Sequence, residues 1–103
     1  MYQYCFVGKR SSGAGPPDAV EYFFEVTSDR KQTYAVSVVL PRQAVLAWAE
    51  THLRPLADSE QYAAVKLRLF RAFDELDDMQ SKGRELYIDS GFLEESLASL
   101  GVE

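Results

Sequence analysis

The chain has 103 residues, 47% of them hydrophobic, and it carries a net charge of −5 at pH 7. This length suits one domain with its own core, and the composition is typical of a globular protein. The acidic balance disfavours nucleic-acid binding, because affinity for nucleic acid depends on Lys and Arg side chains that neutralise phosphates.

The chain contains a single cysteine, Cys5, so it has no pair for an intramolecular disulfide and no Cys/His cluster for zinc. We therefore expect a reducing, cytoplasmic setting and neither a metal nor another cofactor. The first residues lack a basic region followed by an apolar run, and no apolar stretch approaches the roughly 20 residues of a membrane helix. We expect neither a signal peptide nor a membrane span.

Alternating apolar and polar residues predict three strands in the N-terminal half, over residues 2–7, 20–27 and 33–40. A polar turn of hairpin length separates the second and third, which we expect to pair antiparallel. The segment at about 8–19 is rich in Gly, Ser and Pro and predicts a flexible loop.

Helical spacing follows in the C-terminal half. Pro41 suits the first position of a helix that ends near Leu53. A second helix is predicted to begin at Asp58, which has the spacing of a capping box with Gln61, and to continue to about residue 81. A short strand over 85–89 precedes a last helix that Ser90 caps and Gly101 ends.

The resulting order, β-β-β-α-α-β-α, has no repeated βα unit and favours the α+β class. We expect one compact domain over residues 1–103, with the helices packed on one face of a small antiparallel sheet. The outermost strand of such a sheet leaves an edge that must be covered, and pairing with a second copy is a common solution, so we also predict a homodimer.

Residues with catalytic potential are few and do not form a motif. His52 falls near the end of the first helix, where an imidazole faces the negative end of the helix dipole, and Cys5 falls mid-strand, which predicts a packed, inert thiol. An enzyme is therefore the less favoured interpretation. A small-molecule or catalytic site near His52 remains as an alternative.

The candidate partner-binding residues belong to two groups. The second helix carries basic residues followed by a carboxylate cluster without the spacing of a calcium loop, which indicates a solvated face or a docking patch. Phe23 lies between Glu21 and Glu25 on the strand face opposite Tyr22 and Phe24, so it marks a contact surface if no helix covers that face. The candidates are Phe23, Arg68, Arg71, Asp74, Asp77 and Asp78.

These features favour a small acidic protein-interaction module, such as a regulator or inhibitor that docks on a larger assembly whose surface is basic. The partner is expected to be a protein of unknown identity, with no membrane involvement. The remaining alternative is nucleic-acid binding through the loops that carry Lys9, Arg10, Arg30 and Lys31.

Overall fold

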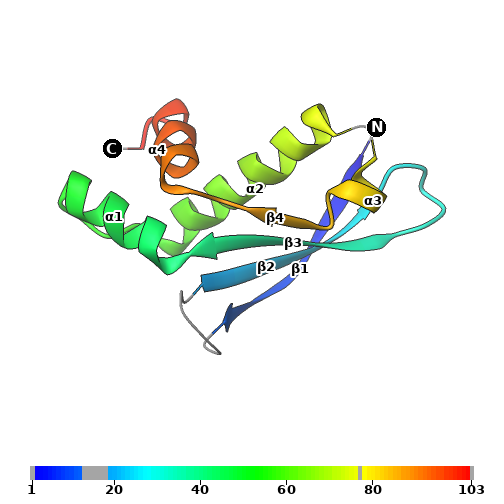
Figure 1. The fold of residues 1–103 in the computed structure, drawn as a ribbon, viewed down its shortest axis with the longest axis horizontal. Helices are drawn as coiled ribbons and strands as arrows, with labels where there is room; N and C mark the ends of the chain where they lie inside the picture. Colours follow the sequence, from blue (N-terminus) through cyan, green and yellow to red (C-terminus); the bar gives the residue numbers. More distant parts are fainter. Residues whose placement is uncertain (1, 13–18, 77, 103) are drawn as a thin grey trace.

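A computed structural model describes residues 2–12, 19–76 and 78–102, and the α+β class and the predicted order of strands and helices are confirmed (Figure 1). One short helix, α3, precedes the last strand and was not predicted. The elements in chain order are β1 (Gln3–Ser12), β2 (Ala19–Thr27), β3 (Tyr34–Pro41), α1 (Arg42–His52), α2 (Asp58–Glu75), α3 (Met79–Lys82), β4 (Glu85–Tyr87) and α4 (Ser90–Ser99).

The four strands form one sheet in the order β1-β2-β3-β4. β1 pairs antiparallel with β2 and β2 antiparallel with β3, whereas β4 pairs parallel with β3. The sheet is therefore mixed rather than purely antiparallel. The chain reaches β4 only after α1, α2 and α3 have carried it back along the sheet, and such a crossover permits a parallel pair.

β1 is longer than the sequence indicates, because it runs through a β-bulge. Phe6 pairs with Phe24, but the next paired residue is Gly8, which faces Phe23, so Val7 is the extra residue. Of the predicted flexible loop at 8–19, residues 8–12 lie in β1 and residue 19 opens β2, while 13–18 lie outside the described residues.

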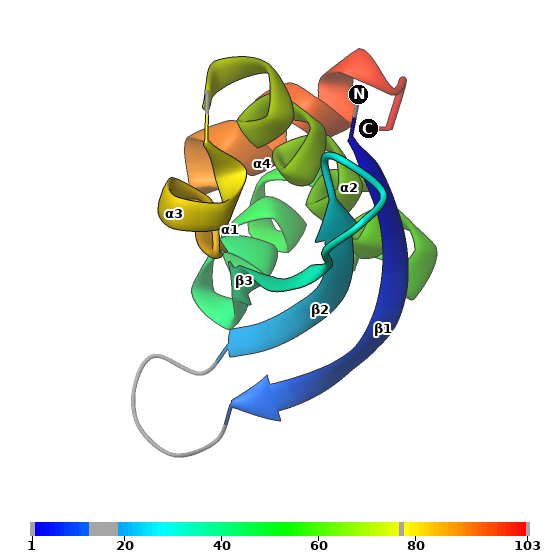
Figure 2. The same cartoon turned by 90° about the vertical axis from the view of Figure 1, so that its right-hand side faces the viewer.

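All the helices lie on one side of the sheet (Figures 1 and 2). From Tyr22 to Val26 in β2 and from Tyr34 to Leu40 in β3, every second residue faces them and is buried, which matches the predicted alternation. The helices contribute Trp48, Leu69, Leu93 and Leu97 to the same core. Period-two strands and 3.6-period helices thus bury their apolar sides against one another.

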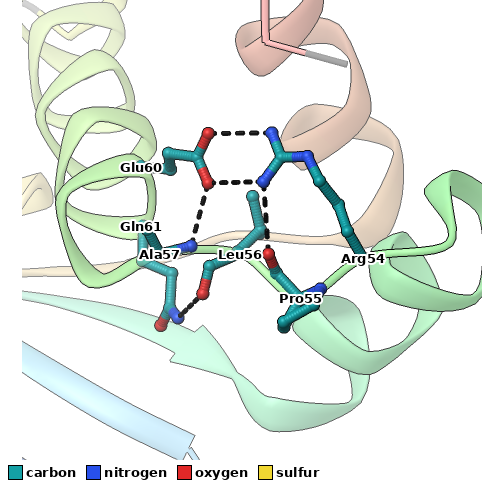
Figure 3. Close-up of polar contacts among 6 residues, drawn as sticks. All are labelled: Arg54, Pro55, Leu56, Ala57, Glu60 and Gln61. Carbon is teal, nitrogen blue, oxygen red and sulfur yellow. Dashed lines mark hydrogen bonds and ion pairs between the residues drawn. The ribbon is translucent and has the colours of Figure 1, made fainter.

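The loop between α1 and α2 is held by a small polar network (Figure 3). Arg54 donates two hydrogen bonds to the carboxylate of Glu60, at 2.9 and 3.0 Å, and the same carboxylate accepts the backbone N–H of Ala57 at 2.9 Å. The hydrogen bonds from Arg54, and then that from Ala57, lower the pKa of Glu60 to about 2. The predicted capping box of Asp58 and Gln61 is therefore wrong by one residue.

Other predicted helix ends shift in the same way. Pro41 precedes the first turn of α1 rather than occupying it, and Leu53 ends that helix in the left-handed conformation. The side chain of Asp89, not Ser90, caps α4 by accepting the N–H of Phe92 at 2.7 Å. α2 ends at Glu75, since Leu76 is extended, and Asp78 then starts a new helical turn by accepting the N–H of Ser81.

Candidate interaction surface on the open side of the sheet

The side of the sheet that faces away from the helices is uncovered in the described part of the chain (Figure 1). We call it the outer sheet face. Strand register places its residues in rows that cross the sheet. One row is Arg10, Glu21, Val39 and Tyr87; the next is Gly8, Phe23, Ser37 and Glu85; the third is Cys5, Glu25 and Ala35.

Phe23 occupies the centre of this face. Its cross-strand neighbours are Gly8 and Ser37, which are too small to cover its ring. The guanidinium of Arg10 lies 5.4 Å from the ring centroid, and Arg10 also reaches Glu21 at 3.6 Å. Phe23 is therefore partly buried, under one arginine rather than under a helix.

The rest of the outer sheet face is acidic and partly apolar. Three carboxylates, those of Glu21, Glu25 and Glu85, accompany the single guanidinium of Arg10 among the described residues of these rows, which leaves a formal charge of −2. Tyr87 is 58% exposed and its hydroxyl donates a hydrogen bond to Glu85. That bond, followed by partial burial and the charges of Glu85 and Glu21, raises the pKa of Tyr87.

Cys5 also lies on this face and is exposed, so the prediction of a packed thiol is wrong. Period-two alternation places Cys5 opposite Tyr4 and Phe6, and the side it occupies has no covering layer. The sheet separates Cys5 from His52, which belongs to the helical layer. The two residues do not form a nucleophile and base pair.

His52 joins two helices. Its Nε2 lies 2.8 and 3.0 Å from the carboxylate oxygens of Glu94 on α4, and its ring stacks on buried Trp48 with a centroid distance of 4.1 Å. Arg54 contacts the same indole, at 4.9 Å from its centroid. The imidazole does sit in the last turn of α1, and these contacts give it a clear role in packing α1 against α4.

A hollow of about 310 Å³ opens beside this pair. Trp48 and small residues form much of its wall, and Thr51, Ser90 and Glu94 provide its hydroxyl and carboxylate groups. Among the described residues, no group of three or more His, Cys, Asp or Glu side chains could hold a metal ion. The lining offers hydrogen bonds but no arranged nucleophile, base and third group.

The charged residues of α2 do not gather into one patch. Arg68 donates to the carbonyl oxygen of Tyr87 at 2.9 Å and so ties α2 to β4. Arg71 pairs with Glu75 at 3.1 Å and covers the ring of Phe92.

The acidic candidates at the end of α2 also differ in their surroundings. Asp74 is exposed, and Asp77 lies outside the described residues. Asp78 is used as the cap of α3, and the hydrogen bonds from Ser81 lower its pKa. Asp74 and Asp78, the described members of the predicted acidic cluster, thus differ in their contacts: the first is exposed on α2 and the second caps α3.

The two basic pairs proposed for nucleic acid lie apart. Lys9 and Arg10 pair with Tyr22 and Glu21 in the first half of β2, whereas Arg30 and Lys31 belong to the turn that follows Thr27. At about 3.3 Å per residue, five or more residues of strand separate them by roughly 17 Å. They do not merge into one basic surface.

No family model, curated protein or solved structure matches this chain. No helix in the described residues is long and apolar enough to cross a membrane.

The contacts that sequence reasoning missed are His52 with Glu94 and Arg10 with Phe23. Neither had a local signal: His52 and Glu94 lie far apart in the chain, and Arg10 reaches the face of Phe23 only because of the register shift after Phe6.

Proposed function

We propose that this protein is an acidic protein-interaction module that docks, as a regulator or inhibitor, on a basic surface of a larger cytoplasmic assembly. The outer sheet face is the proposed contact surface. One observation carries the proposal: in the described part of the chain, an uncovered sheet face presents Phe23, Val39 and Tyr87 among three carboxylates and a single arginine.

The chemistry of this face suits a protein partner with exposed Lys and Arg. Aromatic side chains at the centre of an interface contribute a large share of its binding energy, and the charges around them set orientation and association rate. A cationic side chain of the partner can pair with Glu25 or Glu85 and stack on Tyr87. Binding should therefore weaken as ionic strength rises, because exposed charges are screened.

The cytoplasmic assignment rests on Cys5. An exposed, unpaired thiol on a sheet face is compatible with a reducing compartment, whereas oxidising compartments favour its conversion to an intermolecular disulfide.

The test is affinity capture from the native host, quantified by mass spectrometry, with wild type and a variant that neutralises the outer sheet face. The variant is Glu21→Gln, Glu25→Gln and Glu85→Gln, which changes the net charge from −5 to −2. We expect the captured partner to be rich in surface Lys or Arg and to fall about tenfold in the variant. Purified components should then reproduce this loss by calorimetry.

A matched control separates local from overall charge. It makes the same change of three charges at exposed positions away from the outer sheet face. These are Glu50→Gln, Asp74→Asn and Glu95→Gln. The proposal is refuted if both triple variants lose the partner equally, or if neither does, since the outer sheet face would then have no special role.

A further inference from the structure

The free edge of β1 is unguarded along its first half. In the described part of the chain, β1 has a partner strand on one side only. Exposed edges are commonly protected by charges or bulges. Here the bulge at Val7 and the basic residues Lys9 and Arg10 all follow Phe6, so Gln3–Phe6 offers uncharged backbone with Tyr4 and Phe6 37% and 41% exposed.

An aromatic hollow adjoins this edge. It has a volume of about 320 Å³ and lies between β1, β2 and the first turns of α2. Its walls are the rings of Phe6, Tyr22 and Tyr62, with Lys9 on the strand side, and Asp58 and Ser59 complete the lining on the helix side. This volume is at the lower end of the range of about 300–1,000 Å³ for ligand pockets, and it is large enough for one large side chain.

Lys9 gives the strand side of the hollow a positive charge. Its ammonium lies 5.7 Å from the centroid of the Tyr22 ring, and no carboxylate within the described ranges forms an ion pair with it. The neighbouring Arg10, by contrast, reaches Glu21 on the opposite side of the sheet. A carboxylate placed beside Lys9 would supply the missing partner.

We infer that β1 and this hollow form a second binding site, which takes an extended peptide segment of a partner protein as an added strand. The peptide pairs with the backbone of Gln3–Phe6, inserts one large apolar side chain among Phe6, Tyr22 and Tyr62, and places an acidic side chain beside Lys9. Strand addition commonly combines backbone pairing with such side-chain pockets. The site goes beyond the proposed function, because it lies at the β1 edge and on the helix side of the sheet.

The test uses a blocked peptide of sequence Thr-Val-Trp-Val-Asp, titrated to millimolar concentration into the ¹⁵N-labelled protein. We expect amide shifts confined to β1 and the start of α2, and slower hydrogen exchange for the outward amides of β1. Replacing Trp by Ser in the peptide should weaken binding about tenfold or more, because the hollow then gains no apolar surface.

Two protein variants test the two recognition elements. Lys9→Glu should weaken the peptide roughly three- to tenfold, and a peptide ending in Lys should recover that loss. Ser59→Phe, at an exposed position in the lining, should fill the hollow and remove the preference for Trp over Ser. Lys82→Glu makes the same charge change on α3 and should leave binding unchanged.

Three results would overturn the inference. They are the absence of shifts at millimolar peptide, shifts centred on the outer sheet face, and loss of binding in Lys82→Glu equal to that in Lys9→Glu. A fourth is a concentration-dependent shift of β1 amides without peptide, which would show that a second copy occupies the edge. None of these results would refute capture through the outer sheet face, so the two proposals fail separately.

Discussion

Leu53 ends α1 with φ 59° and ψ 31°, and its side chain is 89% exposed. A Cβ in this left-handed conformation costs about 1–2 kcal/mol. Glycine avoids that cost but loses about 0.5–1 kcal/mol more conformational entropy on folding. Because the exposed leucine contributes little packing, Leu53→Gly should stabilise the protein by the difference, about 0.5–1 kcal/mol.

The assay is urea denaturation followed by circular dichroism and Trp48 fluorescence. We expect a higher midpoint with an unchanged m-value, and a melting temperature raised by about 2–8 °C. Leu53→Ala is the matched control, because it removes the side chain but keeps the Cβ, so its stability should stay within about 0.5 kcal/mol of wild type. A glycine variant no more stable than the alanine variant would show that the left-handed conformation of Leu53 costs no free energy.

Three further predictions each concern a single residue. Glu60→Gln removes a carboxylate whose lowered pKa stabilises the folded state above about pH 4.5, and this contribution is lost as the pH falls toward 2. The stability difference between wild type and variant should therefore shrink over that interval in acid denaturation, and a constant difference would contradict the Arg54 contact. Gly83→Ala should destabilise by about 1–3 kcal/mol in thermal denaturation, because its Cβ would lie 2.4 Å from Sδ of buried Met79. The penalty should be smaller in a Met79→Ala background, and an equal penalty there would locate the strain elsewhere. Cys5 should react with a thiol reagent in the folded protein, and a rate limited by unfolding would show that it is covered.

The class and element order followed from periodicity, because β2, β3 and the helices have strong, uninterrupted patterns. β1 is the exception. Gly8–Ser12 has few strand-forming residues, and its conformation depends on pairing with β2, which tertiary context decides. The direction of β4 was equally inaccessible, since three residues carry no signal for parallel or antiparallel pairing.

The candidate sites divide in the same way. The alternation that places Phe23 opposite Tyr22 and Phe24 is a local property of β2 and was predictable. The stacking of Arg10 on Phe23 depends on the bulge at Val7, because the bulge decides which face Arg10 occupies. Contacts between distant segments, such as His52 with Glu94, leave no trace in local spacing.

The most direct test of the proposed docking surface is hydroxyl-radical footprinting of the protein alone and in complex with its captured partner. Phe23 and Tyr87 report on the outer sheet face, while Leu46 and Leu53, 54% and 89% exposed on α1 and its C-terminal cap, report on the helical side. We expect slower oxidation of Phe23 and Tyr87 in the complex and unchanged rates for both leucines. Protection of Leu46 and Leu53 with no change at Phe23 and Tyr87 would contradict this expectation.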